Sequence, residues 1–379
     1  MDNALSLYVH WPFCRSKCPY CDFNSYAGET IEQERWRSSL LREIEYFANE
    51  TNGRVLASVF FGGGTPSLMA PETVAAVIAA ARRHWPTIDD LEITLEANPT
   101  SSEADHFAAL AAAGVTRLSL GVQSFDDAAL AFLGRAHDAA EAKRAIGLAA
   151  AAFERYSFDL IYARPGQTAA DWRRELAEAL SFAPGHLSVY QLTIEPGTAF
   201  HQRGVVAADE DVAAVLYETT HEVLETAGLP AYEISNHARP GAECRHNLAI
   251  WRGGDYVGVG PGAHGRLSGA GRAEALRQIH TPARWLAAVD RQGHGTAQRV
   301  RLDARQRAEE LIMLGLRTAE GVNRTRFAAQ SGIALDDAVD AAAAAELVDG
   351  GFLEADGETL RATAAGRQRL NAVLSRLLA

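Results

Sequence analysis

Cysteine is scarce in this chain, and its distribution is uneven. The 379 residues contain four cysteines, and three of them, Cys14, Cys18 and Cys21, fall within eight positions. Thiols inside cells stay reduced, so clustered cysteines there are more often ligands or catalytic groups than disulfide partners. The cysteine cluster is therefore the first candidate for a functional site.

Long apolar runs and a surplus of basic residues are also absent. No stretch of about 18 apolar residues occurs, so no transmembrane segment is expected. Residues 1–6 lack the basic start and apolar run of a secretory signal. We expect a cytoplasmic location, with peripheral contact to a membrane left open. The chain has 36 Lys and Arg residues and 48 Asp and Glu residues, which gives a net charge of −12. This acidic balance disfavours nucleic acid as a partner.

Short apolar strands alternate with longer amphipathic helices, the pattern of a parallel α/β sheet. Strands are expected over residues 5–9, 57–61, 91–95, 117–122, 158–162 and 186–193. Helices are expected over residues 32–48, 71–83, 102–113, 128–133, 139–152, 168–182 and 209–227. Six such units predict a TIM-like barrel or partial (β/α)6 barrel, with chemistry at the carboxyl ends of the strands.

The remaining third of the chain has a different composition. Residues 232–269 are rich in Gly, His and Asn and are expected to be irregular, with a soft boundary at Gly265–Gly271. Residues 280–379 are helix-rich and end with a turn and a short strand at 359–361. We therefore predict a barrel domain over 1–270 and a C-terminal winged-helix-like domain over 280–379.

The cysteine spacing C-x3-C-x2-C indicates an iron–sulfur cluster. A compact loop can place three thiolates around one [4Fe–4S] cubane, each on a different iron. The fourth iron is then free to bind a small molecule, as the open position of a catalytic zinc site is. The alternatives are a zinc site and free thiols. Structural zinc usually takes four closed ligands, and this spacing matches none of its common patterns.

The cysteine motif and several further segments together resemble the radical S-adenosylmethionine (SAM) superfamily. The segments are Tyr8–Cys21, Phe61–Ser67, Glu96–Pro99, Gly121–Phe125, Leu133–His137, Asp159–Tyr162 and Tyr190–Pro196. They are most similar to the branch that contains oxygen-independent coproporphyrinogen III oxidase and the heme chaperones. The resemblance covers nearly the whole chain and implies a radical SAM partial barrel, with the cluster on Cys14, Cys18 and Cys21.

The resemblance also implies a set of SAM-binding residues. They are Tyr8, Gly63, Gly64, Thr65, Glu96, Gln123, Arg135 and Asp159. Glycine permits close approach of backbone N–H groups, carboxylates can bind a ribose or an ammonium group, and arginine can bind a carboxylate. The alternatives are a plain glycine turn and surface carboxylates. The positions of these residues at successive strand ends favour a common site.

Two features separate the chaperones from the oxidase in this branch. The oxidase has a fourth cysteine where this chain has Phe23, and it has an extra segment before the first strand, whereas this chain starts seven residues before Tyr8. His246 and Trp251 lie in a segment that resembles the H-N-x-x-Y-W motif of the heme chaperones, with Ile250 in place of the tyrosine. The resemblance therefore implies heme binding, with His246 and Trp251 as candidates.

Other roles for these residues stay open. Histidine is a common axial ligand of heme iron, but His246 could instead stabilise a loop through a hydrogen bond. His237 and His264 are competitors for the heme, and His264 could lie near SAM. Cys244 could be a spare thiol or a heme-linking group, and we interpret it as inert.

The resemblance implies a heme chaperone that carries a SAM-liganded [4Fe–4S] cluster and passes heme to a membrane-bound respiratory apoprotein. The alternative is a radical SAM enzyme, in which SAM supplies a radical that attacks a porphyrinogen propionate. A third interpretation, modification of nucleic acid, is disfavoured by the acidic composition. The oligomeric state is open, and a dimer linked through cluster or heme is one option.

Overall fold

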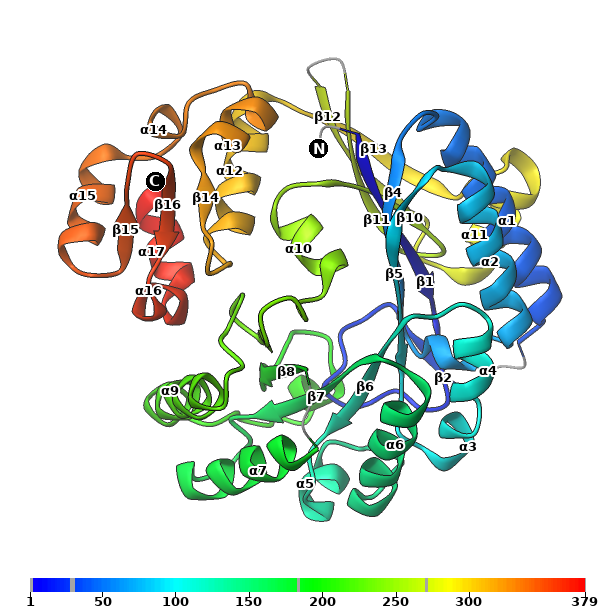
Figure 1. Ribbon diagram of the computed structural model, residues 1–379, viewed down its shortest axis with the longest axis horizontal. Coiled ribbons are helices and arrows are strands. Elements are labelled where there is room, and N and C mark those ends of the chain that lie inside the picture. The colour runs from blue at the N-terminus through cyan, green and yellow to red at the C-terminus, as the bar shows by residue number, and fades with distance from the viewer. Residues whose placement is uncertain (1–2, 28–30, 183–184, 270–271, 379) are drawn as a thin grey trace.

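The computed structural model describes residues 3–27, 31–182, 185–269 and 272–378. Figure 1 shows a large curved sheet that does not close, with most helices on its convex side. The fold is therefore the open, partial α/β barrel that the sequence predicts.

Six parallel strands form the centre of this sheet and confirm the six predicted strands. They are β1 (Ala4–Trp11), β4 (Val55–Gly63), β5 (Thr87–Ala97), β6 (Arg117–Gln123), β7 (Arg155–Tyr162) and β8 (His186–Gln191). Successive side chains of a strand point to opposite faces. In β1, Leu5, Leu7 and Val9 are buried in the main hydrophobic core, whereas Ser6 and Tyr8 face the interior of the barrel. The alternation in the sequence thus sets which residues face that interior.

The helices between the strands confirm most of the predicted ranges. They are α1 (Gln33–Glu50), α2 (Pro71–His84), α5 (Asp127–Phe132), α6 (Ala139–Ala152), α7 (Ala169–Ser181) and α9 (Glu210–Thr226). Pro71 starts α2, and capping boxes at Asp138 and Thr168 start α6 and α7, as expected from the chemistry of helix termini. Among the described residues, no helix is both long enough and apolar enough to cross a membrane.

One predicted helix is divided into two in the structure. The segment 102–113 forms two short helices, α3 (Ser101–Ala104) and α4 (Phe107–Ala112), with a turn at Asp105 and His106. The segment contains no glycine or proline at this point, so the sequence lacks the usual signals of a helix break.

The expectation of an irregular segment over residues 232–269 is wrong. This part of the chain and the residues after it form β9 (Asn236–Ala238), α10 (Arg245–Trp251), β10 (Asp255–Val259), β11 (His264–Gly269), β12 (Arg272–Gln278), α11 (Pro282–Gln292) and β13 (Thr296–Leu302). The strands extend the central sheet to the order β13-β12-β11-β10-β1-β4-β5-β6-β7-β8-β9. A Cβ atom on Gly258 would lie 1.9 Å from the carbonyl oxygen of His264. Glycine is thus needed for close packing of the β10–β11 pair, although in a sequence it indicates a loop.

The C-terminal part has its own hydrophobic core. It consists of α12 (Ala304–Gly315), β14 (Val322–Asn323), α13 (Arg324–Ser331), α14 (Leu335–Ala338), α15 (Ala341–Asp349), β15 (Leu353–Ala355), β16 (Thr359–Ala362), α16 (Ala364–Gln368) and α17 (Leu370–Leu377). The helices and the small β15–β16 hairpin match the predicted helix-rich region. Because α11 and β13 belong to the large sheet and its helical layer, residues 280–302 pack with the barrel. The division into two domains stays a prediction.

The helix α10 has a special position. Figure 1 shows it on the concave side of the sheet, opposite to the helices α1, α2 and α6. It packs against β4 and α12. This helix therefore separates the barrel interior from the C-terminal part of the chain.

Candidate cofactor site

The carboxyl ends of the central strands surround a cavity of about 400 Å³. This volume is within the ~300–1,000 Å³ range of sites that enclose a small molecule. Side chains converge here because parallel strands all end at the same edge of the sheet. The predicted site residues that line the cavity are Cys14, Cys18, Cys21, Gly63, Gly64, Thr65, Glu96, Gln123, Arg135 and Asp159.

The three clustered cysteines lie on one loop and are half-buried. Cys14 ends the short strand β2 (Phe13–Cys14), which pairs with β3 (Tyr26–Ala27) and closes the loop. The side chain of Asn24 fixes the loop from outside by donating to the carbonyl oxygen of Pro261 at 2.8 Å. The loop thus presents three thiols to one space, as binding of a cubane requires.

Several polar side chains reach the cysteine sulfurs, among them Ser25, whose Oγ lies 3.8 Å from Cys21 Sγ. Thr65 Oγ1 donates to Cys14 Sγ at 3.4 Å, and Arg135 Nη1 donates to Cys18 Sγ at 3.1 Å. Burial raises the pKa of Cys14, and the hydrogen bond from Thr65 partly opposes this. No three His, Cys, Asp or Glu side chains of the described residues converge on a single metal ion. A cubane needs no such convergence, because each thiolate binds a different iron.

Three side chains at the cavity carry buried polar atoms without a hydrogen-bond partner. The atoms are Gln123 Oε1, Arg135 Nε and Asp159 Oδ1. Buried polar groups are nearly always paired, so unpaired ones around a cavity indicate a polar ligand. An arginine suits a carboxylate, and carboxylates suit an ammonium group or a ribose diol. The residues present therefore fit the polar groups of SAM.

Burial raises the pKa values of the two carboxyl groups of the site, Glu96 and Asp159. Burial, and after it the nearby Asp159, raises the pKa of Glu96 to about 8. Burial also raises the pKa of Asp159 to about 6, against hydrogen bonds from Ser188 and Ser119. A bound cation favours the charged form of a neighbouring carboxyl group. Both carboxyl groups are therefore expected to become more acidic when a cationic ligand enters.

Asn98 is a site residue that the sequence analysis did not identify. Its Nδ2 donates to Thr65 Oγ1 at 3.1 Å, and its Oδ1 accepts from Arg135 Nη2 at 2.5 Å. It thereby ties two predicted residues together at the cavity wall. Its position directly after β5, in the segment Glu96–Pro99, could have identified it as a site residue.

Two residues beside the cavity have an unusual backbone conformation. Gln123 and Ala163 are the only described non-glycine residues with positive φ, at 71° and 58°. This conformation costs roughly 1–3 kcal/mol for each residue and persists only where surrounding contacts impose it. Gln123 ends β6, and Ala163 directly follows β7. In each case the next residue, Ser124 or Arg164, contacts the same buried carboxylate.

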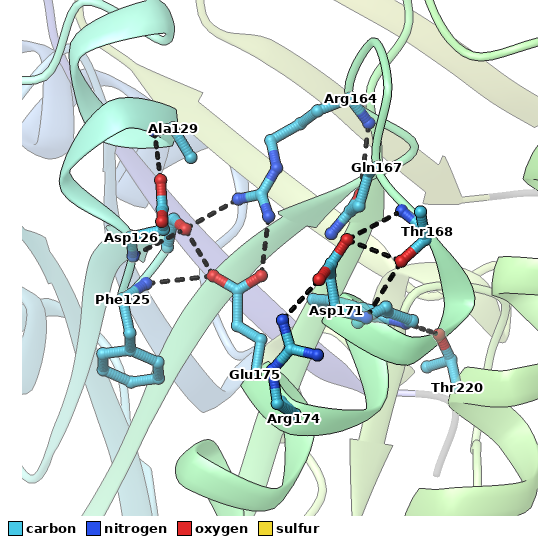
Figure 2. Close-up of polar contacts among 12 residues, drawn as sticks. Phe125, Asp126, Ala129, Arg164, Gln167, Thr168, Asp171, Arg174, Glu175 and Thr220 are labelled. Carbon is cyan, nitrogen blue, oxygen red and sulfur yellow. Dashed lines mark hydrogen bonds and ion pairs between the residues drawn. The ribbon is translucent and has the colours of Figure 1, made fainter.

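That carboxylate is Glu175 of α7, and Figure 2 shows Phe125 and Arg164 meeting it from two sides. Its Oε1 accepts from the backbone N–H of Phe125 at 3.0 Å and from the hydroxyl of Ser124. Its Oε2 accepts from Arg164 Nη2 at 2.7 Å, and Arg164 Nη1 donates to Ser124 Oγ at 2.7 Å. We call Glu175, Arg164 and Ser124 the Glu175 network. It fixes the turns after β6 and β7 and, with them, the direction of Gln123.

Tyr8 is the predicted SAM residue that does not line this cavity. Its Oη lies 3.1 Å from Nδ1 of His10, and its ring centroid is 6.3 Å from that of Phe60. Tyr8 lines a second cavity of about 250 Å³, which also contains the first residues of β6 and β8 and so lies toward the amino ends of the strands. Its role at SAM stays a prediction.

His246, the candidate heme ligand, faces this second cavity and is only 2% exposed. Its Nδ1 lies 2.9 Å from Ser58 Oγ, and its ring centroid is 5.0 Å from that of Phe60. Burial lowers the pKa of His246 to about 3, so the ring is neutral, and Nε2 has no partner. Sites for drug-sized molecules start at ~300 Å³, so a porphyrin ring does not fit beside His246 in this arrangement.

Trp251 lies on another side of α10. Five positions at 100° each place it about 140° around the helix from His246. The guanidinium carbon of Arg317 lies 4.7 Å from the centroid of its ring, and Arg317 also donates to Glu233 at 2.6 Å. The structure therefore does not bring Trp251 and His246 together. Ile250, which stands where the motif has tyrosine, lines the second cavity with His246.

The other candidates for heme contact line neither cavity. His237 is buried with its ring centroid 5.1 Å from that of His221, and His264 is exposed on β11. The thiol of Cys244 is buried 3.6 Å from Glu92 Oε1, and burial raises its pKa to about 11. A protonated thiol is a poor ligand and nucleophile, which fits the expected inert role.

Comparisons with known proteins match this chain to radical SAM proteins over nearly its whole length. The model of the Radical SAM superfamily matches residues 8–179, and that of the HemN C-terminal domain matches residues 302–369. Heme chaperone HemW of Escherichia coli (strain K12) is 38% identical, covering 99% of this chain and 98% of that protein. Radical S-adenosyl methionine domain-containing protein 1, mitochondrial, of Mus musculus is 44% identical, covering 85% of this chain and 75% of that protein.

A solved structure shows the same fold. Coproporphyrinogen III oxidase (HemN) from Escherichia coli, a radical SAM enzyme, matches with a TM-score of 0.83 over 99% of this chain and 90% of that chain. The two sequences are 23% identical, so this likeness concerns the fold alone.

Proposed function

Because this chain belongs to the radical SAM superfamily, in the branch that includes the heme chaperone HemW, we propose that it is a heme chaperone. The superfamily uses a [4Fe–4S] cluster and SAM as cofactors. The observation that carries the proposal is the match over the full chain to relatives named heme chaperone HemW. In this proposal the protein binds heme as well as the two cofactors, and transfers heme to an acceptor apoprotein.

At the cofactor end, Cys14, Cys18 and Cys21 hold the cluster. A cluster held there would supply the electron-transfer chemistry that SAM cleavage needs. One nitrogen of Arg135 donates to Cys18 Sγ, and its buried Nε has no partner, so Arg135 would meet both the cluster and SAM. It can therefore orient a carboxylate beside the cluster.

The other predicted residues hold the remaining polar groups of SAM. Gln123 presents an amide oxygen without a partner, and Glu96 and Asp159 present carboxyl groups. Gly63 and Gly64 allow the chain to pass close to the backbone of the cysteine loop, because a Cβ on Gly64 would lie 2.6 Å from the carbonyl oxygen of Phe13. This close approach brings the turn after β4 to the cavity.

At the other end, His246 is the proposed ligand of heme iron. Its neutral ring with an unpaired Nε2 suits metal binding. Heme binding through this nitrogen requires α10 to move away from Ser58 and Phe60, because the space beside the ring is small. Trp251 contributes by holding the opposite side of α10 against Arg317.

We further propose that the acceptor is a membrane-bound respiratory apoprotein. Heme transfer then takes place at the cytoplasmic surface of a membrane, with the protein in peripheral contact, and a dimer is one form in which it acts. Co-sedimentation with membranes that contain or lack such an acceptor tests the contact. Binding that does not depend on the acceptor would contradict it.

A titration separates a chaperone from a porphyrinogen-converting enzyme. Hemin is added to the protein with its reconstituted cluster, followed by optical spectroscopy, and the same sample is assayed for conversion of coproporphyrinogen III with SAM and reductant. We expect stoichiometric hemin binding that His246→Ala weakens, and no conversion. Conversion without hemin binding would rule out the chaperone function.

A further inference from the structure

The second cavity is lined mainly by polar side chains. It lies inside the barrel between α10 and the wall formed by Glu96 and Asp159, and its volume is about 250 Å³. Arg117, His186 and His246 are among the side chains that line it. None of them takes part in the cofactor site described above.

Arg117 is a buried cation that makes no direct ion pair, although Glu92 and Asp159 are among the charged groups near it. It is 3% exposed at the start of β6, and its Nη2 donates to Ser157 Oγ at 2.8 Å. No carboxylate of the described residues lies within 4.0 Å of its nitrogens. In contrast, Arg155 on the neighbouring strand pairs with Glu92 at 2.7 Å. Buried charges are normally paired directly, so the guanidinium group of Arg117 can still bind an anion that enters the cavity.

Two histidines of the same cavity also have nitrogens without partners. Nδ1 of His186 and Nε2 of His246 are buried and unpaired, and both side chains are 2% exposed. The remaining ring nitrogens contact hydroxyl groups: His186 Nε2 lies 2.8 Å from Tyr232 Oη, and His246 Nδ1 lies 2.9 Å from Ser58 Oγ. Tyr232 Oη can donate to His186 Nε2, and the ring of His186 then has its N–H on Nδ1, the unpaired nitrogen. Ser58 Oγ donates to Ser6 Oγ at 2.9 Å, so it accepts from His246 Nδ1, and Nε2 of His246 is left as an acceptor.

We propose that the second cavity binds a carboxylate group, held by the guanidinium group of Arg117 and by a ring N–H group of His186. Arginine binds carboxylates through two parallel hydrogen bonds. The cavity has room for a short-chain acid but not for a porphyrin ring. The carboxylate has two sources, a free short-chain acid or a propionate arm of heme, and the second source rests on the proposed function.

Sodium propionate is a suitable probe for the site itself. Melting of the full-length protein with its cluster is followed while propionate is added. We expect propionate to stabilise the wild type and to bind Arg117→Met at least about tenfold more weakly, with Arg117→Lys in between. Arg83→Met is the matched control, because Arg83 is exposed on the outer helix α2, and it should respond like the wild type.

A second measurement applies if Arg117→Met does not fold. In wild-type protein labelled with ¹⁵N-histidine, propionate should shift the ring nitrogens of one histidine toward the tautomer that donates into the cavity. His186→Phe should remove this signal, and His246→Phe should keep it. If no ring nitrogen shifts, or if Arg117→Met responds to propionate like the wild type, the proposal is wrong and the cavity holds only water.

Hemin and hemin dimethyl ester distinguish the two sources. If a heme propionate enters the site, the ester binds the wild type at least about tenfold more weakly than hemin, and Arg117→Met loses this preference. If propionate binds but hemin and its ester bind alike, the ligand is a free acid. If hemin does not bind at all, the proposed chaperone function fails, whereas the propionate result still decides the carboxylate site.

Discussion

The two ends of the barrel interior differ in how ready they are for a ligand. At the cofactor end, the cysteine loop and the strand ends surround an open cavity, and Gln123 and Asp159, which line it, each have a buried polar atom without a partner. At the other end, α10 covers the interior, and His246 is packed against Phe60 in a smaller space. The cofactor end therefore offers a ligand both space and unpaired polar groups without rearrangement, whereas heme binding at His246 would require α10 to move.

The largest expected effect is at the cysteine loop. Cys18→Ser removes one of the three thiolates, so we expect complete loss of the cluster's visible absorption and electron resonance after anaerobic reconstitution. Cys244→Ser is the matched control, because Cys244 is buried beside Glu92 at the other end. It should keep the cluster. Loss of the cluster in both variants would mean that cluster binding does not depend on the cofactor end alone.

The Glu175 network tests whether the cofactor end is held in place by contacts behind it. Glu175→Gln leaves the charge of Arg164 unpaired in a buried place, and breaking such a pair costs about 3–5 kcal/mol of unfolding free energy. We expect this loss in chemical denaturation, and SAM binding weaker by about tenfold because Gln123 is no longer held in place.

The matched control is Glu178→Gln on the same helix, because Glu178 pairs with Lys143 at the surface. It should change the unfolding free energy by less than about 1 kcal/mol. A stable Glu175→Gln protein with normal SAM affinity would show that Gln123 does not depend on the network.

The heme end is tested by two residues of α10. His246→Ala should weaken hemin binding by at least about tenfold, whereas Trp251→Phe should change it by less than about threefold, because Trp251 faces Arg317 and not the barrel interior. Optical titration measures both. Equal effects would mean that the two residues act together on heme, against their separate positions in the structure.

The smallest expected effect is the pH dependence of SAM affinity at the cofactor end. Because burial raises the pKa of Asp159 to about 6, its carboxyl group is charged above this pH and neutral below it. SAM is cationic, so its affinity should rise with pH through 6, by at most about tenfold per unit. Glu96 and Arg135 also face this space, and Asp159→Asn isolates the contribution of Asp159 by removing this step. Calorimetric titration with SAM between pH 5 and 8 measures this dependence. If the affinity of Asp159→Asn still rose through pH 6, the step would not belong to Asp159.

Much of the cofactor end could be predicted from the sequence. Its residues come from one loop and from the ends of successive strands, and strand periodicity and cysteine spacing are local signals. Gln123, Arg135 and Asp159 were accordingly expected in one place, and they line one cavity. Glu175 was missed although it carried a signal, because it is a glutamate on the buried face of α7 between Trp172 and Leu176.

The other end depends on contacts that no local pattern gives. A motif suggested that His246 and Trp251 act together, but the turn of α10 separates them. In the sequence, Arg117 is simply the polar first residue of a strand, and only the fold shows that it lies inside the barrel without a direct ion pair. The strands β10 and β11 were hidden by the glycines that allow them to pack closely.

The most direct test of the central claim uses the reduced cluster as its own probe. The claim is that three thiolates bind the cluster and leave one iron facing the SAM cavity. After anaerobic reconstitution and reduction, the electron paramagnetic resonance spectrum should change on addition of SAM, and it should change less in Arg135→Met. A protein that contains only zinc, or a spectrum that stays the same with SAM, would contradict the claim.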